Sequence, residues 1–204
     1  MISTMIEPEI YTSKRLLFRR LTADDAQAVF DGWASDVQST QWMGWKRHET
    51  LTDTLAFIAD SDMQWERDGI GPFVMELRKA ESSEPLFDDE QACQATTIPA
   101  LVGSSSFRVT NPDNAADELE LGYIFAPSFW GQGFAGETLS AMMDYARSRR
   151  YRRLIARVHG DNAASDRVLI KHGWTEPVTP LPRGSCPNLK SQDYLQLDYE
   201  LVLE

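Results

Sequence analysis

The chain of 204 residues carries 20 Lys and Arg against 31 Asp and Glu, a formal charge of −11, and is 42% hydrophobic. This composition predicts one globular domain and argues against a disulfide scaffold and against a basic surface for nucleic acid. No apolar run approaches the roughly 20 residues of a membrane span, and the first ten residues lack the basic start of a signal peptide. We therefore expect a cytoplasmic protein with a cationic partner, and we expect its isolated Cys93 and Cys186 to be free, reduced thiols.

The first part of the chain predicts two strands and two helices. A strand over residues 15–21 precedes Thr22, whose hydroxyl is a candidate N-cap for a helix that runs to about Ser35. A helical period resumes over residues 51–67 and ends before a glycine-rich turn. Residues 73–77 then form a second predicted strand.

The segment 80–99 differs in composition from the rest of the chain. It contains five acidic residues and no Lys or Arg. Such a segment predicts a flexible acidic insertion in an otherwise single domain that spans 1–204. Since it holds five of the eleven excess negative charges, the remainder of the chain carries −11 + 5 = −6.

The second part alternates strands and helices. Strands are expected over residues 101–109 and 118–125, with a turn at 111–114 between them. On the second of these strands, Leu119, Leu121, Tyr123 and Phe125 share one face, and Glu118 and Glu120 lie on the other. A helix to about Arg150, a strand over 154–158, a helix after Asn162 and a last strand over 194–203 follow.

The glycine segment Gly131-Gln132-Gly133-Phe134-Ala135-Gly136 has two interpretations. Glycines that open a helix let backbone N–H groups approach a diphosphate. A dinucleotide-binding site would require the first glycine directly after a strand and a second βαβ half downstream, with Asp161 as the ribose partner. Five residues separate the strand from Gly131 and only 68 residues follow Gly136, which disfavours this interpretation.

The second interpretation rests on a resemblance that spans about residues 12–203. Glu120-Leu121-Gly122-Tyr123, Trp130-Gly131-Gln132-Gly133-Phe134-Ala135 and Asn162-Ala163-Ala164-Ser165, in this order, resemble the GNAT N-acetyltransferases, in the branch of the ribosomal-protein N-terminal acetyltransferases. The resemblance implies an α/β (α+β) GNAT fold. Its sheet would be mixed and mostly antiparallel, flanked by helices, and splayed between the fourth and fifth strands, near Phe125 and Val158.

By the same resemblance, acetyl-CoA is the expected cosubstrate, with no metal. The backbone of the pyrophosphate loop, Gly131 to Gly136, would hold its diphosphate. The strand Tyr123, Ile124 and Phe125 would pair with the pantetheine arm, which Asn162 would also touch, although capping its own helix is an adequate role for Asn162. Arg167 is placed for the adenosine phosphates.

Direct transfer to an amine needs a base and a proton donor but no protein nucleophile. Glu120 is the candidate general base because it points away from the core face of its strand. The alternative is that Glu118 and Glu120 are both solvated carboxylates. Many relatives carry a tyrosine seven residues after the motif asparagine as the acid, and here that count reaches Leu169. Ser165, Tyr123 or water would have to take over.

The acceptor is not specified by any motif. Trp42 and Trp45 precede the helix over 51–67, where relatives frame the acceptor, and we expect an aromatic wall there, with ordinary packing as the alternative. A protein N-terminal amine and a small-molecule amine both remain open, with no nucleic acid or membrane as partner and a homodimer possible. A non-catalytic acyl-CoA-binding regulator is the contrasting hypothesis, motivated by Leu169.

Overall fold

An eight-stranded sheet organises the computed structural model, with the strand order β1-β2-β3-β4-β5-β6-β8-β7. The structure describes residues 11–78, 100–110, 118–175, 181–184, 186–189 and 193–203, so the predicted insertion at 80–99 and the turn at 111–114 lie outside the described residues. The strands are β1 (Tyr11–Thr12), β2 (Leu16–Arg20), β3 (Pro72–Leu77), β4 (Leu101–Val109), β5 (Glu118–Phe125), β6 (Arg153–His159), β7 (Leu181–Gly184) and β8 (Asp193–Val202).

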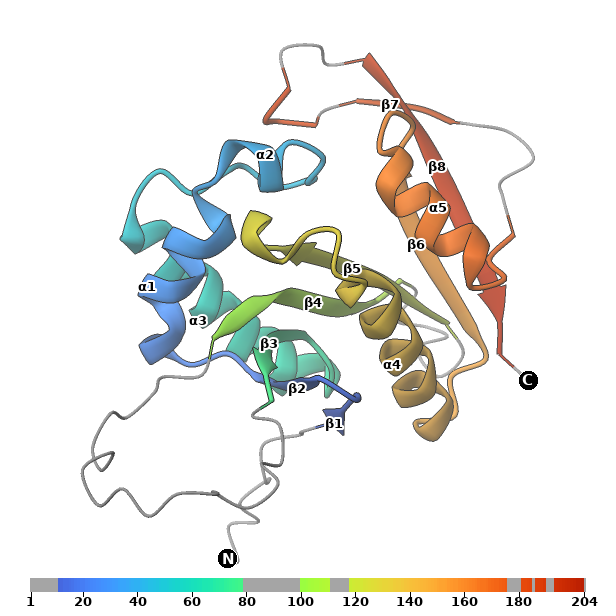
Figure 1. Cartoon of the computed structure of the whole chain (residues 1–204), viewed down its shortest axis with the longest axis horizontal. Coiled ribbons are helices and arrows are strands. Elements are labelled where there is room, and N and C mark those ends of the chain that lie inside the picture. Colours follow the sequence, from blue (N-terminus) through green and yellow to red (C-terminus); the bar gives the residue numbers. More distant parts are fainter. Residues whose placement is uncertain are drawn as a thin grey trace, which may run out of the picture.

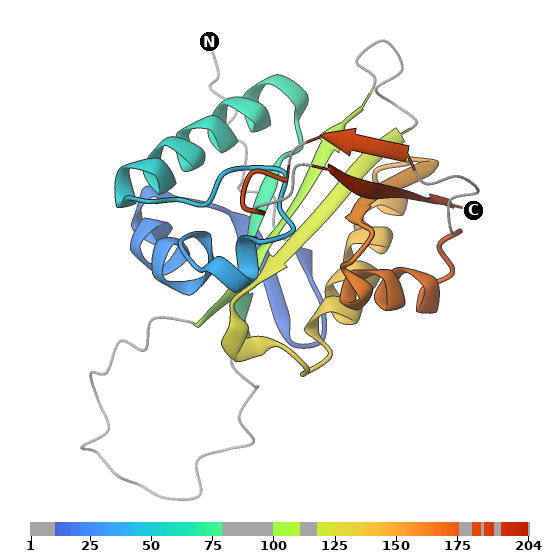
Figure 2. The same cartoon turned by 90° about the horizontal axis from the view of Figure 1, so that it is seen from above.

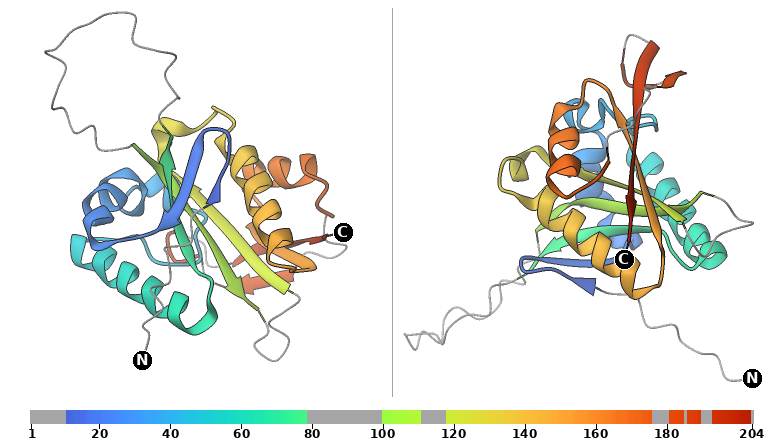
Figure 3. Two further views of the ribbon diagram at one scale, coloured as in Figure 1. Left: turned by 90° about the horizontal axis from the view of Figure 1, so that it is seen from below. Right: turned by 90° about the vertical axis from the view of Figure 1, so that its right-hand side faces the viewer.

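Helices cover both faces of this sheet (Figures 2 and 3). The α-helices are α1 (Ala26–Val29), α2 (Val37–Thr40), α3 (Leu51–Asp68), α4 (Phe134–Ser148) and α5 (Ala163–Lys171). Short 3-10 segments occupy Ala23–Asp25 and Pro127–Phe129, and a π-helical turn occupies Phe30–Ala34. The expected mixed, mostly antiparallel sheet is confirmed, since β5 and β6 form its parallel pair.

Local sequence explains where α3 begins and ends. The Thr50 hydroxyl accepts from the Asp53 N–H, and the Asp53 carboxylate accepts from the Thr50 N–H, which forms a capping box. Gly69 ends the helix in the left-handed conformation, with φ 66°. Within α3, Thr54, Ile58, Ser61 and Trp65 are buried at helical spacing.

The helix expected from Thr22 to Ser35 is not a single α-helix. It starts as a 3-10 turn, continues as α1 and widens into the π-helical turn, because both the N–H and the Oγ of Ser35 bond to the Phe30 carbonyl. This wide turn buries Trp33 and Ala34. Three short elements, β1, β7 and α2, were not predicted, because two to four residues cannot display a hydrophobic period.

Two hydrophobic clusters hold the layers together. The larger joins α4 and α5 to one face of the sheet through residues such as Phe107, Leu119 and Leu139. The smaller joins α1 and α3 to the opposite face through Val29, Ile58 and Ile124. The alternation predicted for β5 is therefore confirmed, since its odd-numbered residues pack in the larger cluster and Ile124 packs in the smaller one.

The sheet opens between β5 and β6, as expected (Figure 1). The two strands pair over four residues, Glu118–Leu121 on β5 and Arg153–Ala156 on β6, whereas β6 stays paired with β8 along its whole length. Beyond Leu121 the two strands diverge. Among the described residues, no helix is long and apolar enough to cross a membrane.

Candidate active site

A cavity of about 450 Å³ lies where β5 and β6 diverge. Its walls come from both sides of the sheet: from the loop after α2 on one side and from α5 on the other. The cavity brings together seven of the residues predicted for the site: Trp42, Trp45, Glu120, Tyr123, Ile124, Asn162 and Ser165. Phe125, the loop Gly131 to Gly136 and Arg167 are not part of its lining.

Glu120 lies on the cavity wall and carries two ion pairs. Its Oε2 accepts from Arg108 Nη2 at 2.6 Å and from Arg157 Nη1. The Glu120 side chain is 16% exposed. Two guanidinium groups therefore share one oxygen of the Glu120 carboxylate on the wall of the cavity.

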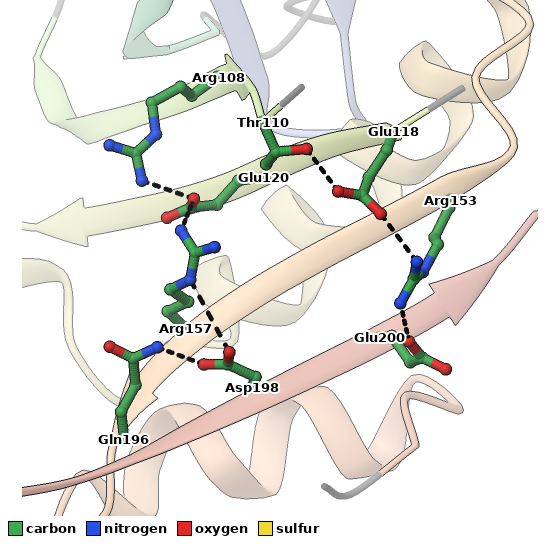
Figure 4. A network of polar contacts seen from close by, with 9 residues as sticks. All are labelled: Arg108, Thr110, Glu118, Glu120, Arg153, Arg157, Gln196, Asp198 and Glu200. Atoms are coloured by element: carbon green, nitrogen blue, oxygen red, sulfur yellow. Dashed lines mark hydrogen bonds and ion pairs between the residues drawn. The ribbon is translucent and has the colours of Figure 1, made fainter. Parts of the chain in front are cut away.

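The two ion pairs belong to a stripe of charge that crosses β4, β5, β6 and β8 (Figure 4). Arg157 also lies 3.9 Å from Asp198, and Arg153 bridges Glu118 and Glu200. Glu118 accepts from the Thr110 hydroxyl and is not part of the cavity lining. Sequence reasoning missed Arg108 as a partner of Glu120. Its position opposite Glu120 depends on the β4–β5 register, which only the structure defines.

Aromatic rings form one side of the cavity. The ring centroids of Trp42 and His159 are 4.5 Å apart, and those of Trp45 and His48 are 5.2 Å apart. Burial lowers the pKa of both His48 and His159, so both are neutral at pH 7. His159 Nδ1 accepts from the Asp161 N–H at 3.1 Å, which places the ring proton on Nε2. Trp42 and Trp45 thus both line the cavity, and their contact with an acceptor stays a prediction.

Trp42 and Trp45 belong to the loop after α2, which we call the aromatic loop. Asn188, near the C-terminal end of the chain, hydrogen-bonds to this loop. Asn188 Nδ2 donates to the carbonyl oxygens of Thr40 and Trp45, each at 2.8 Å, and Asn188 Oδ1 accepts from the Arg47 N–H at 2.8 Å. Cys186, a free and buried thiol, lies next to the same loop, while Cys93 lies outside the described residues. Sequence reasoning assigned no role to Asn188.

Polar groups at the start of α5 form the opposite side of the cavity. Asn162 Oδ1 accepts from the Ser165 N–H, and Asn162 Nδ2 donates to Ser165 Oγ, both at 3.2 Å. Asn162 therefore caps its helix, which was one of its two expected roles. The Tyr123 hydroxyl is buried beside Ser165 without a hydrogen bond of regular geometry, and burial raises its pKa. Leu169 is 1% exposed and packs in the larger cluster.

The glycine loop shapes the start of α4. Gly131 and Gly133 adopt positive φ values of 73° and 79°, and Gly133 is the N-cap of α4. At Gly136 a Cβ atom would lie 3.0 Å from His172 Cε1, so the absent side chain lets α4 approach α5. The first-turn N–H groups of a helix have no partner within the helix, so those of Phe134, Ala135 and Gly136 can receive an anion.

The β1–β2 turn fastens this loop from outside. Glu137 Oε1 accepts from Ser13 Oγ at 2.7 Å and from the Arg15 N–H at 2.6 Å. Arg15 Nε donates to Glu137 Oε2, and Arg15 Nη1 donates to the Gln132 carbonyl at 3.1 Å. Although burial opposes it, this set of hydrogen bonds lowers the pKa of Glu137. Residues of the β1–β2 turn therefore stabilise the glycine loop and the first turn of α4.

The exposed edge of β5 offers one set of backbone groups to the cavity. The Ala126 N–H bonds to Val102 of β4, so the alternation of an antiparallel pair directs the N–H and C=O of Tyr123 toward β6. The Phe125 carbonyl points the same way but already accepts from Trp130 Nε1 and Ser39 Oγ. The backbone of Ile124 belongs to the ladder with β4. Of these three predicted residues, Tyr123 presents its backbone to the gap.

Two further predictions concern groups away from the cavity. Arg167 is exposed on α5, and its contact with a phosphate remains a prediction. No group of three or more His, Cys, Asp or Glu that could hold a metal occurs in the part of the chain that the structure describes.

Comparison with known proteins gives matches in sequence and in structure. Residues 15–175 match the family model described as an acetyltransferase (GNAT) domain. An uncharacterized N-acetyltransferase, YoaA of Bacillus subtilis, is 26% identical over 81% of this chain and 82% of its own.

Two solved structures share the fold. The ribosomal-protein alpha-N-acetyltransferase RimL in complex with coenzyme A has a TM-score of 0.71 and 20% identity, over 96% of this chain and 98% of its own. The spermidine N-acetyltransferase of Vibrio cholerae, in complex with coenzyme A and spermine, has a TM-score of 0.70 and 15% identity, over 93% and 96%.

Proposed function

This chain belongs to the GNAT acetyltransferase family, and from that premise we propose that it transfers an acetyl group from acetyl-CoA directly to a primary amine in a ternary complex. The observation that carries the proposal is the cavity between β5 and β6. It unites a carboxylate from β5 with the polar start of α5. A cavity with walls from both sides of a sheet suits two substrates that meet in the middle.

The residues around the cavity fit acetyl-CoA. The left-handed glycines and the first-turn N–H groups of α4 can bind a diphosphate, and the Tyr123 backbone can pair with an amide-containing arm. Acetyl-CoA supplies the activated acetyl group and a thiolate leaving group. In the structures of relatives, RimL binds coenzyme A, and the spermidine enzyme binds coenzyme A together with its polyamine.

Glu120 is proposed as the general base. Its Oε2 is occupied by the two arginines, so Oε1 is the oxygen directed to a substrate. An acceptor ammonium beside this anion can lose its proton to the carboxylate, directly or through a water, and the free amine then attacks the thioester carbonyl. Because the amine attacks directly, no covalent acetyl-enzyme is required.

Ser165 is proposed as the proton donor to the thiolate. Its Oγ already accepts from Asn162 Nδ2, so its own proton is free to be directed into the cavity. The second proton, which the nitrogen loses as the amide forms, returns to Ser165 through water and balances the proton given to the thiolate. The adjacent Tyr123 hydroxyl, whose pKa is raised by burial, keeps its proton at pH 7 and can hydrogen-bond to Ser165. The pair replaces the tyrosine that is missing at Leu169.

The test begins with calorimetric titration of acetyl-CoA into the protein and into its Gly133→Val variant. We expect micromolar binding by the wild type and weaker binding by the variant, because valine cannot adopt the positive φ of Gly133 without strain. A screen of primary amines, with free CoA as the readout, follows. Binding of acetyl-CoA with no transfer to any amine would support a regulator, and absence of binding would refute the proposal.

The Glu120→Gln variant tests the base separately. We expect kcat to fall about a hundredfold or more while acetyl-CoA affinity stays unchanged, because the variant keeps the shape but loses the proton acceptor. Unchanged turnover would remove Glu120 from the mechanism without affecting the family assignment.

A further inference from the structure

The charge inside the cavity differs from that of the chain as a whole. The chain carries −11, but the charged lining residues are Arg108, Arg157 and Glu120. His48 and His159, which also line the cavity, are neutral at pH 7 because burial lowers their pKa. The lining is thus +1 − 1 + 1 = +1. The acidic composition of the chain favours a cationic acceptor. The cavity lining, however, contains one carboxylate, Glu120, with which a polycation could pair.

The two arginines on Glu120 are not held alike. Arg157 has a second carboxylate, Asp198, 3.9 Å away, and its side chain is 35% exposed. Arg108 makes one hydrogen bond to Glu120, and its side chain is 62% exposed. A guanidinium has five N–H donors in a planar fork that fits a carboxylate, so Arg108 retains donors for an incoming anion.

The remaining walls suit a flat apolar group. Trp42, Trp45 and Phe57 line the same cavity as Arg108 and Glu120. The rings of Trp42 and Trp45 pack tilted against His159 and His48, at interplanar angles of 40° and 46°. Aromatic walls favour apolar and aromatic groups, and a polyamine would find one carboxylate, Glu120, in this lining.

From these three observations we propose that the acceptor is a primary amine that carries an anionic group beside an aromatic or apolar body, the chemistry of an aromatic α-amino acid. Arg108 binds its carboxylate, Glu120 receives its ammonium, and the tryptophans contact its ring. This inference rests on the acetyltransferase activity proposed above and names the substrate class for the same cavity.

The arrangement also couples recognition to proton transfer. In the free protein Arg108 occupies Oε2 of Glu120. An acceptor carboxylate that pairs with Arg108 draws this guanidinium away, which leaves Glu120 paired with Arg157 and gives the acceptor ammonium access to Oε2. An amine without an anionic group leaves Arg108 in place. Arg108 is therefore a specificity-determining residue that also positions the base.

The test compares three acceptors: phenylalanine, phenethylamine, which lacks only the carboxylate, and spermidine. For the wild type we expect kcat/KM for phenylalanine to exceed that for phenethylamine by about tenfold or more, with spermidine poorest. Arg108→Gln should reduce the ratio of the two aromatic amines to near one, mainly through the KM of phenylalanine, and Arg108→Lys should restore part of it. Arg67→Gln, at an exposed arginine that pairs with Asp68 at the end of α3, should keep the wild-type ratio.

Calorimetric binding of the same amines to the complex with CoA gives a second readout that does not depend on turnover. We expect phenylalanine to bind the wild type more tightly than phenethylamine does and to lose this advantage in Arg108→Gln. A preference for phenethylamine or spermidine, a ratio unchanged by Arg108→Gln, or transfer to peptide N-termini alone would overturn the inference and leave the acetyltransferase proposal standing. Absence of acetyl-CoA binding would refute both.

Discussion

Ser165 and Tyr123 are the two cavity-lining side chains whose hydroxyl groups we propose as the source of the thiolate's proton. Ser165 is anchored by Asn162, while the Tyr123 hydroxyl is buried without a regular hydrogen bond. A buried polar group without a partner costs stability, so its presence beside a cavity suggests a use in the presence of substrate. Leu169, at the position where the resemblance implies an acid, packs in the larger hydrophobic cluster.

Ser165→Ala should lower kcat by about tenfold to a hundredfold, with little change in acetyl-CoA affinity. The capping bond from the Ser165 N–H to Asn162 Oδ1 survives this substitution, so the helix should stay folded. Tyr123→Phe should lower kcat less and leave the melting temperature unchanged or higher, because it removes a buried unpaired hydroxyl. Steady-state rates and thermal melts of both variants measure this, and full activity in both would assign the proton to water.

His159 should make stability depend on pH. Its folded pKa lies below the ordinary value of 6.5, chiefly because it is buried, with the exposed Asp161 as a weaker opposing influence. The unfolded chain therefore binds the proton more readily, and the stabilising difference is present above pH 6.5 and is lost as the pH falls below it. Between pH 7.5 and 5.5 the melting temperature of the wild type should fall further than that of His159→Gln. Equal decreases would contradict this assignment.

At the scale of elements, β4 and β5 leave no room for a side chain at Gly103. A Cβ atom there would lie 2.1 Å from the Ile124 carbonyl oxygen and 2.9 Å from Phe125 Cα. Both contacts are backbone atoms of a paired strand, so they cannot move aside independently. This close approach fixes the end of β5 that borders the cavity.

Gly103→Ala should therefore destabilise the fold by more than about 3 kcal/mol, because the two strands must separate. Gly122→Ala in β5 is the matched control, since its new Cβ meets Ser106 Oγ at an ordinary 3.7 Å. Urea denaturation of both variants compares the two free energies of unfolding. Comparable losses would show that the close approach at Gly103 is not rigid.

Sequence reasoning predicted the elements whose period is long and strong. The helices α3, α4 and α5 and the strands β2, β3, β4, β5, β6 and β8 appear within a few residues of their expected bounds. The site was predicted where side chains alternate along one strand, as at Glu120. Arg108 and Asn188 could not be predicted, because each contacts its partner through a strand register or a long loop that local patterns do not encode.

At the scale of the whole molecule, Asn188 joins the two arms of the open sheet. It belongs to the segment between β7 and β8, on the arm of β6, and its side chain binds the loop after α2, on the arm of β5. The four residue pairs of the β5–β6 ladder hold the other end of the gap. The width of the cavity is thus determined at both ends.

Asn188→Ala should loosen the aromatic loop without affecting the glycine loop. We expect about 1–3 kcal/mol lower stability, from three lost hydrogen bonds that are partly replaced by water. We also expect an acceptor KM raised by about tenfold, because Trp45 is no longer held in position. The affinity for acetyl-CoA should stay unchanged. The control is Gln27→Ala, which removes an exposed amide bonded to Asp31 and should leave stability, acceptor KM and acetyl-CoA affinity unchanged. Equal loss of affinity for both substrates would argue against separate control of the two sides.

The short ladder between β5 and β6 should also be visible in amide hydrogen exchange. The N–H of Gly122 faces β4 and pairs there, whereas the N–H of Tyr123 points into the gap where β6 has already turned away. Adjacent amides of one strand should thus exchange at very different rates, with Tyr123 the faster. Acetyl-CoA should slow the exchange of the Tyr123 amide and leave that of Gly122 unchanged. The Tyr123 amide proton would thus report when a bound substrate accepts a hydrogen bond from the open edge of β5.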